Sequence, residues 1–195
     1  MTSRTELRQL IRQRRQQLSH QQQQHAAHAL AERFCQWPGL SDCQHIALYL
    51  SNDAELDTWP LIHALWQRQK DVYLPLLHPF TSGHLIFQHF LANTPMRCNQ
   101  FGIPEPDLSC PDLLPLPRLD LITTPLVAFD AKGNRLGMGG GFYDRTLAGF
   151  ALETAAGRPR VMGIAHGCQQ VDAIPAEAWD VPLPAICTPE QIFLP

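Results

Sequence analysis

Residues 126–145 read LVAFDAKGNRLGMGGGFYDR and decide the kind of fold that this chain can adopt. The apolar run 126–129 predicts a short buried strand, and 130–134 has the composition of a turn. Four glycines within five positions follow the turn, and a helix is expected to begin after Gly141. A strand, a turn, a glycine-rich loop and a helix in this order are typical of α/β proteins that bind an anion at the loop.

The glycine-rich loop favours phosphate binding. Glycines let the backbone approach a ligand closely and leave amide N–H groups free to converge on an anion. Lys132 and Arg135 flank the loop, and either could complete a phosphate cradle. The segment lacks the Gly-Lys-Ser/Thr ending of a Walker A loop, and Phe142 occupies the last glycine position of a G-x-G-x-x-G motif. The alternative is a turn that needs glycine only for its backbone geometry, which the flanking cations disfavour.

The N-terminal segment predicts two helices. Ser3 with Glu6 and Ser19 with Gln22 both have the spacing of a capping box. We therefore expect one helix that runs to about residue 18 and a second that ends at the Trp-Pro-Gly sequence of 37–39.

The middle of the chain predicts a strand–helix–strand unit. Residues 46–50 predict a buried strand, a helix is expected from Thr58, and a further strand at 72–74 is expected to stop at Pro75. Such a unit favours a right-handed parallel connection. Further strands are predicted at 85–90, 119–122, 161–165 and 185–187. Five prolines between residues 104 and 117 predict a long irregular connection. The alternation of strands and helices indicates a layered α/β domain without internal repeats.

Composition limits the class of protein. Of 195 residues, 45% are hydrophobic and 17% are charged, which is typical of one ordinary globular domain. The formal net charge of −3 gives no general attraction to nucleic acid or to a membrane surface. The sequence has no secretory h-region and no apolar stretch of membrane-spanning length, so we expect a cytoplasmic protein. Its six cysteines form no C-x-x-C pair, which favours free thiols over zinc ligands or disulfides.

The chain resembles the 5-formyltetrahydrofolate cyclo-ligase family. The most specific match is the glycine-rich run 135–144. Four further segments occur in the expected order: Arg4 with Arg8, residues 51–58, FGIPEP at 101–106 and IPAEAWD at 174–180. The resemblance spans nearly the whole chain. It implies a single three-layer α/β/α domain over residues 1–195, with a mostly parallel mixed sheet similar to the NagB/RpiA/CoA transferase-like fold. The N-terminal helices, at 3–36, would pack on this core.

The resemblance also implies an activity. It is the ATP- and Mg²⁺-dependent closure of 5-formyltetrahydrofolate to 5,10-methenyltetrahydrofolate, with release of ADP and phosphate. Transfer of the γ-phosphoryl group to the formyl oxygen would give a phosphorylated intermediate that N10 of the folate can attack. Such a transfer depends mainly on positioning and charge neutralisation. A monomer that binds neither nucleic acid nor membrane is the expected form.

The resemblance assigns roles to individual residues. The residues implied in catalysis are Arg135 and Tyr143. Those implied in ATP binding are Arg4, Arg8, Arg135, Leu136, Gly137, Met138, Gly139, Gly140, Gly141, Phe142 and Tyr143. Those implied in folate binding are Leu50, Glu55, Met138, Gly140 and Phe142. The implied magnesium ligands are Asp144 and Asp180, whose oxygen atoms suit this ion.

Each role has a plainer alternative. The spacing puts Arg4 and Arg8 on one helical face with Arg12 and Arg15, which could be a solvated basic face, whereas Arg14 is predicted to fall within the apolar stripe. Glu55 could be a solvated loop carboxylate, Leu50 a buried strand residue, and Asp144 a helix-start charge. Met138 and Phe142 stand where family members often carry tyrosine or a larger polar residue, so their contacts stay open.

Three other functions are weighed against this one. A non-catalytic folate or nucleotide binder is disfavoured by the presence of Arg135, Asp144 and Asp180 together. An RNA-associated protein is disfavoured because only the first helix is arginine-rich. An ATP-dependent enzyme that acts on a related formylated substrate stays open. Among nine histidines, His25 and His28 lack a third metal ligand, and His166 has no assigned role.

Overall fold

The computed structural model describes residues 3–148, 159–175, 177, 180 and 182–195. It is built around one eight-stranded sheet with the strand order β12-β11-β10-β7-β1-β2-β3-β6. The central strands β11, β10, β7, β1 and β2 run parallel, and the outer strands β12, β3 and β6 run antiparallel to their neighbours. The bounds of these strands are β1 His45–Ala47, β2 Asp71–Leu77, β3 Leu85–His89, β6 Leu113–Leu114, β7 Leu121–Pro125, β10 Arg160–Ile164, β11 Ile186–Cys187 and β12 Ile192–Phe193.

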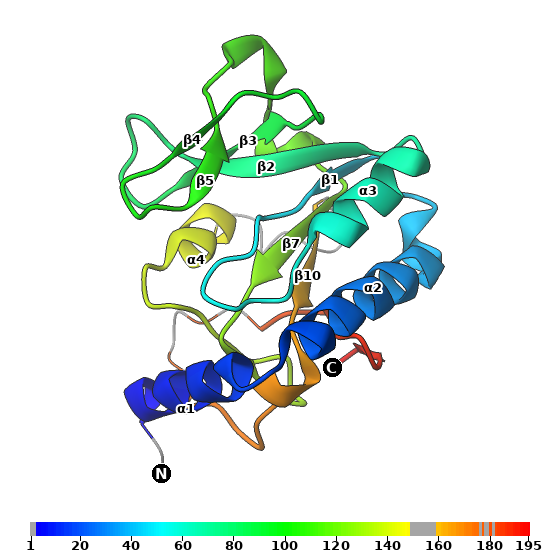
Figure 1. Ribbon diagram of the computed structural model, residues 1–195. Helices are drawn as coiled ribbons and strands as arrows, with labels where there is room; N and C mark the ends of the chain where they lie inside the picture. The colour runs from blue at the N-terminus through cyan, green and yellow to red at the C-terminus, as the bar shows by residue number, and fades with distance from the viewer. Residues whose placement is uncertain (1–2, 149–158, 176, 178–179, 181) are drawn as a thin grey trace.

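Helices cover both faces of this sheet, which confirms the predicted α/β architecture with a mostly parallel sheet (Figure 1). α2 (His20–Gln36) and α3 (Trp59–Gln67) bury Leu30, Phe34 and Leu61 against one face. α4 (Phe142–Leu147) places Leu147 in a smaller cluster with β-strand residues on the other face. Cover on both sides explains why successive residues of β2 and β7 are buried, and not only alternate ones.

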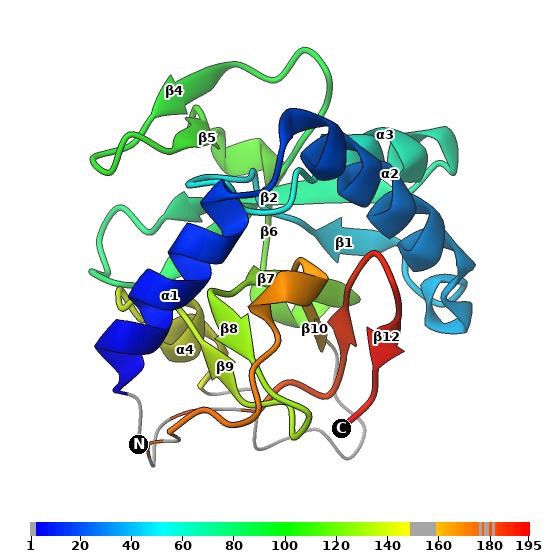
Figure 2. The same cartoon turned by 60° about the horizontal axis from the view of Figure 1, so that its bottom comes forward.

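Both predicted capping boxes are present. Ser3 precedes α1 (Arg4–Gln16), and Ser19 precedes α2; each serine hydroxyl accepts a hydrogen bond from the third helical residue, whose side chain accepts one from the serine backbone. These reciprocal hydrogen bonds satisfy two otherwise orphaned amide groups at each helix start. The short break between the end of α1 and the start of α2 lets α1 turn away from α2. α1 then lies along the β-hairpin formed by β8 (Ala128–Phe129) and β9 (Arg135–Leu136), as Figure 2 shows. Leu7 and Ile11 pack there against Val127 and Leu136.

The expected stop at Pro75 is wrong, because β2 continues to Leu77. Pro75 lies opposite Phe87 in the antiparallel pair of β2 and β3. Backbone hydrogen bonds of this pair fall on even residues, since Phe90 N donates to Val72 O and His78 N to His84 O. The nitrogen of Pro75 therefore faces the other side of the strand. β1 pairs only as far as Tyr73, so the proline removes no ladder hydrogen bond.

The proline-rich connection is more ordered than the sequence predicts. It contains the hairpin of β4 (Met96–Cys98) and β5 (Pro104–Pro106), then a short 3₁₀ turn at Cys110–Asp112, β6, and a second such turn at Leu116–Arg118. Buried Glu105 anchors this hairpin, because its carboxylate accepts hydrogen bonds from Arg97, from Asn99 and from the backbone N of Leu77 in β2. The hairpin therefore has a fixed position beside the sheet.

Smaller differences from the sequence predictions concern where strands end and two short strands that were not predicted. The parallel unit β1–α3–β2 is confirmed, but β1 ends at Ala47 rather than at residue 50. The two-residue strands β9 and β12 were not expected. All six cysteines are free thiols. Within the described residues no helix is long and apolar enough to cross a lipid bilayer.

Candidate functional site

A cavity of about 450 Å³ lies at the carboxyl ends of the parallel strands. Residues that follow β1 and β7 line one side of it, among them Leu50 and Leu126, and the glycine-rich loop lines another. The β4–β5 hairpin supplies Asn99, Phe101 and Ile103. The carboxyl edge of a parallel sheet is where α/β proteins usually bind ligands. Most of the exposed surface of the cavity wall is apolar, which suits a flat ring system.

The glycine-rich loop needs its glycines for two different reasons. Gly139 has φ +104° and Gly141 has φ +64°, and side chains rarely adopt such backbone angles. At Gly141 a Cβ atom would also lie 2.9 Å from Nη1 of Arg145. α4 begins directly after Gly141 but has only six residues. The loop amides and the nearby arginines, more than a long helix, are therefore the groups available to an anion.

Arg135 is the buried cation of the site. It lies in β9, is 6% exposed, and forms an ion pair with Asp144 in the first turn of α4. Both residues line the cavity. Lys132, the other candidate for the phosphate cradle, is exposed at the β8–β9 turn and does not line the cavity in the described part of the chain. The structure therefore favours Arg135 over Lys132.

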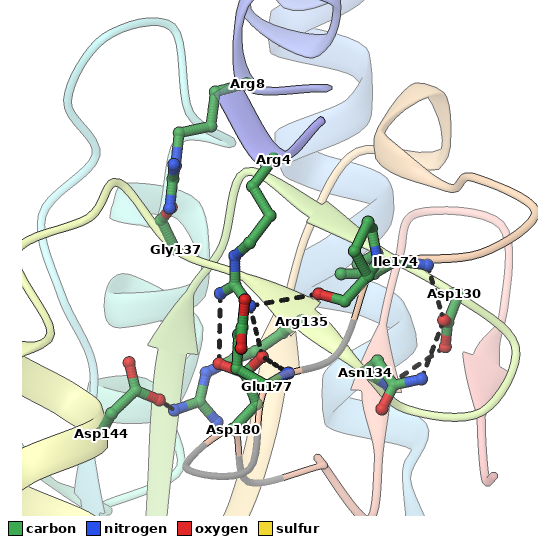
Figure 3. Close-up of polar contacts among 11 residues, drawn as sticks. Arg4, Arg8, Asp130, Asn134, Arg135, Gly137, Asp144, Ile174, Glu177 and Asp180 are labelled. Carbon is green, nitrogen blue, oxygen red and sulfur yellow. Dashed lines mark hydrogen bonds and ion pairs between the residues drawn. The ribbon is translucent and has the colours of Figure 1, made fainter. Parts of the chain in front are cut away.

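Arg4 and Arg8 come from α1, whose N-terminal half lies beside the loop (Figure 3). Arg8 donates from Nε to the backbone oxygen of Gly137 at 2.8 Å. Arg4 donates to both carboxylate oxygens of Asp180, at 2.5 and 3.1 Å. Burial alone would raise the pKa of Asp180, but the Arg4 hydrogen bonds hold it below its usual value. The hydrogen bond to Asp180 in turn raises the pKa of Arg4.

Asp144 and Asp180 belong to one cluster of charged side chains with Arg4 and Arg135. The charges of both carboxylates act on Arg4, and the charges of both arginines act on Asp180. Figure 3 shows the Arg135 guanidinium between Asp144 and the chain at Asp180. Two partly exposed carboxylates beside a phosphate-binding loop are the protein ligands that Mg²⁺ usually takes, the rest being water and phosphate oxygens. These two residues therefore fit the ion. Among the described residues no three His, Cys, Asp or Glu side chains come together as a metal cluster.

Glu55 is a partly buried carboxylate and not the solvated loop residue of the plainer alternative. Burial raises its pKa to about 7, although a backbone hydrogen bond from Asn52 and the charge of Arg15 act in the opposite direction. Tyr143 also lines the cavity, and its hydroxyl oxygen is buried without a hydrogen-bond partner among the described residues. Burial and the Glu55 charge both raise the pKa of Tyr143, so its phenol stays protonated and can donate to a ligand.

Most of the remaining residues implied by the resemblance also reach the cavity. Lining residues include Leu50, Gly137, Met138, Gly140, Gly141 and Phe142. Leu136 does not line it, because its side chain is fully buried against α1. Gly139 belongs to the loop but does not line the cavity, and Arg4, Arg8 and Asp180 lie beside the loop and outside the cavity wall. Several of the residues that the resemblance associates with ATP therefore line the same cavity as those that it associates with folate.

Sequence reasoning missed three features of the site. Phe101, at the hairpin tip, contacts Phe142 edge-on with 5.7 Å between ring centroids. Arg145 donates to the backbone oxygens of Gly140 and Gly83, which joins the loop to the β2–β3 connection. The prediction for α1 is wrong in one respect: Arg14 is exposed, and Arg15 is the buried arginine. The signal was available, because Leu7, Ile11 and Arg15 follow one another at intervals of four residues.

Comparisons with known proteins agree with this geometry. Residues 1–189 match the model of the 5-formyltetrahydrofolate cyclo-ligase family. The chain is 47% identical over 184 residues to the 5-formyltetrahydrofolate cyclo-ligase of Escherichia coli (strain K12), which covers 94% of this chain and 99% of that protein. It is 48% identical over 180 residues to that of Haemophilus influenzae, covering 92% and 94%.

A solved structure has the same fold. The NMR structure of 5,10-methenyltetrahydrofolate synthetase from Aquifex aeolicus superposes with a TM-score of 0.80 at 26% identity, over 98% of this chain and 92% of that one. The family match covers residues 1–189 of the 195 residues of this chain. This chain therefore belongs to the 5-formyltetrahydrofolate cyclo-ligase family.

Proposed function

We propose that the cavity binds the pterin part of 5-formyltetrahydrofolate beside ATP held at the glycine-rich loop. The protein is an ATP-dependent ligase of folate metabolism that converts 5-formyltetrahydrofolate to 5,10-methenyltetrahydrofolate. The observation that carries the residue assignment is the position of the loop: Arg135, Gly137 and Tyr143 face the same cavity as Glu55. A nucleotide and a folate bound to these groups would be in contact.

Glu55 and Tyr143 would hold the folate. A carboxylate accepts hydrogen bonds from the amino and ring N–H groups of a pterin, and the protonated phenol of Tyr143 donates one. The apolar wall, which includes Leu50, Met138 and Phe142, would cover the ring faces and exclude water. In this position the formyl group would point toward the loop.

Arg4, Arg8 and Arg135 would bind the phosphates. The formyl oxygen attacks the γ-phosphorus, the bond from that phosphorus to the ADP oxygen breaks, and the formyl carbon becomes electrophilic. N10 of the folate then attacks this carbon, and phosphate leaves with the former formyl oxygen and the N10 proton. Guanidinium groups stabilise the charge that spreads over the phosphoryl oxygens during transfer.

Asp144 and Asp180 would hold Mg²⁺, which neutralises phosphate charge when it is bound. In the structure both carboxylates are already paired with arginines. When a nucleotide arrives, the same arginines gain phosphate oxygens as partners, and the carboxylates gain a cation. We further propose that the protein is a cytoplasmic monomer that acts without nucleic acid or membrane.

The test is incubation of the purified protein with ATP, Mg²⁺ and 5-formyltetrahydrofolate, while the absorbance of the methenyl product and the release of ADP are recorded together. We expect both products in equal amounts, and almost no ADP when the folate is left out. Folate binding without turnover would favour the non-catalytic binder. Rapid ADP release without folate would indicate a plain ATPase and contradict the proposal.

A further inference from the structure

Arg15 is a cation in an unusual environment. It lies in the last turn of α1, is 0% exposed, and has the largest fully buried side chain in the described part of the chain. Its Nη2 donates to Oδ2 of Asp53 at 3.1 Å, while Nε and Nη1 have no hydrogen-bond partner among the described residues. A buried guanidinium is costly to desolvate, and loss of its one anionic partner would leave its charge uncompensated.

The partner of Arg15 lies in a strained turn. Asp53 has φ 51° and Ala54 has φ 56°, so two consecutive residues with side chains adopt the left-handed region. Glu55 N donates to Asn52 O at 3.0 Å, which closes a four-residue turn of the type that normally requires glycine or asparagine at its central positions. Alanine at the second central position gives the turn no side-chain hydrogen bond of its own. An outside contact is needed to hold it.

The turn sets the position of the Glu55 side chain. Asn52 N donates back to Oε2 of Glu55 at 3.1 Å, so the carboxylate is fixed against the same four residues. Asn52, Asp53 and Glu55 all line the cavity. Arg15 therefore reaches the cavity wall indirectly, from behind the turn.

We infer that Arg15 is a positioning residue for the folate site, which holds the Asn52–Glu55 turn in its left-handed conformation through Asp53. This inference rests on the proposed folate contact of Glu55. A second arginine, Arg12, forms an ion pair with the same oxygen of Asp53, 2.7 Å from its Nε, but its side chain is 48% exposed. Water screens that contact, so Arg12 contributes much less than its distance suggests.

Arg15 also acts on the charge of Glu55. The groups that face this carboxylate come from four parts of the chain: Arg15 in α1, Asp53 in the turn itself, Tyr49 after β1 and Tyr143 in α4. Of these, Arg15 lowers the pKa of Glu55 and Asp53 raises it. Loss of the Arg15 charge should therefore raise the pKa of Glu55 further and delay its ionisation to higher pH.

The test compares Arg15→Met with Arg12→Met in the full-length protein. Arg15→Met should raise KM for 5-formyltetrahydrofolate on the order of tenfold, leave KM for ATP within about twofold, and move the rise of kcat/KM with pH toward higher pH. Arg15→Lys keeps a positive charge without the guanidinium. It should therefore bring the pH profile closer to that of the parent than it brings KM for 5-formyltetrahydrofolate. Arg12→Met should resemble the parent in all three measurements.

A second pair keeps the test decisive if Arg15→Met fails to fold. Asp53→Ala removes the ion pair and keeps the backbone strain, whereas Ala54→Gly relieves strain at the next residue and keeps the ion pair. Asp53→Ala should reproduce the rise in KM for folate, and Ala54→Gly should not. Equal folate KM values for Asp53→Ala and Ala54→Gly, or for Arg15→Met and Arg12→Met, would overturn the inference. An inactive parent protein would instead overturn the proposed function.

Discussion

Arg135 is the residue whose charge the proposed reaction uses most directly. It is buried, it lines the cavity, and its partner Asp144 belongs to the same site. Because Asp144 is partly exposed, removal of Arg135 leaves no carboxylate fully buried without a partner. A variant at this position should therefore affect turnover far more than folding.

Arg135→Ala should lower kcat/KM by on the order of a hundredfold or more, because a guanidinium that stabilises the transferring phosphoryl group is lost. Lys132→Ala is the matched control, since Lys132 flanks the same turn but is exposed. Steady-state kinetics should show a large loss for the first variant and little change for the second. Near-parental kinetics for Arg135→Ala would remove Arg135 from the site.

Glu55 gives a prediction about pH. Its pKa is raised to about 7 in the folded chain from an ordinary value of 4.5, so the folded state binds the proton more tightly than the unfolded state. The stability due to Glu55 is present below about pH 4.5 and is lost as the pH rises through about 7. Glu55→Gln cannot ionise. The variant should become more stable than the parent across this window, by at most roughly 3 kcal/mol at high pH.

Thermal unfolding of Glu55→Gln and the parent at several pH values measures this gap. His166, whose pKa burial lowers to about 4, titrates in an overlapping range but is present in both proteins and cancels in the difference. Calorimetry on the same variant should show weaker folate binding and nearly unchanged ATP binding, because the amide replaces one acceptor oxygen with a donor. A gap in stability that does not depend on pH would contradict the raised pKa.

At the residue scale the family resemblance predicts which side chains come together at the cavity better than it predicts how deeply they are buried. Arg135, Glu55 and Asp144 were assigned through the family resemblance, and they line one cavity. The burial of Glu55 was not predictable from a loop sequence of polar residues, because it depends on α1 and α4, which lie far away in the chain. The wrong prediction for Arg14 has a simpler origin. Leu7, Leu10, Ile11 and Leu18 recur at helical spacing, and Arg14 continues that stripe, whereas the buried row is Leu7, Ile11 and Arg15.

Two elements organise the site, namely the glycine-rich loop and α1. α1 contacts the loop through Arg8 at one end and the Asn52–Glu55 turn through Arg15 at the other. The loop reaches φ +104° at Gly139, a conformation nearly restricted to glycine. The backbone conformation of the loop therefore depends on glycine at this position and not on packing alone.

Gly139→Ala should raise KM for ATP on the order of tenfold, because backbone strain of roughly 1–3 kcal/mol opposes the conformation that presents the loop amides. The melting temperature should change little, since Gly139 is exposed. Gly137→Ala is the control for added bulk, because its Cβ would meet no atom within 4 Å and its φ is not positive. Equal KM values for ATP in the two variants would exclude backbone conformation as the cause.

Elements with local signals were predicted well. The capping boxes fix the starts of α1 and α2, and the helix after Gly141 begins where expected. The β4–β5 hairpin is not predictable from the sequence pattern, because its strands have three residues each, which is too short to show a period of two, and β5 begins and ends at prolines. The sequence does not show that β2 can continue through Pro75. A strand accepts proline where the side that its nitrogen faces has no paired neighbour, and the sheet decides which side that is.

At the scale of the whole molecule, distant segments assemble the site. Arg4 and Asp180 are separated by 176 positions in the sequence, yet their side chains form a bidentate pair of hydrogen bonds. The strand order, in which β7 lies between β10 and β1, brings the glycine loop next to the turn after β1. Sequence patterns gave the α/β class, but this order follows from long-range packing that no local pattern contains.

Asp144→Asn and Asp180→Asn should each raise the Mg²⁺ concentration needed for half-maximal turnover. The double variant should show less than the sum of the two effects on free energy, because both carboxylates would act through one ion. Turnover measured against Mg²⁺ concentration for the parent, the two single variants and the double variant gives the coupling. Strictly additive effects would mean that the two carboxylates act independently.

The central claim is that the formyl oxygen receives the γ-phosphoryl group at this site. The most direct measurement uses 5-formyltetrahydrofolate with ¹⁸O in the formyl group, ATP without label, and mass analysis of the inorganic phosphate after turnover. Our account predicts that each phosphate released carries the ¹⁸O atom. Methenyl product formed together with unlabelled phosphate would contradict it, because the phosphoryl group would then have gone to water and not to the folate.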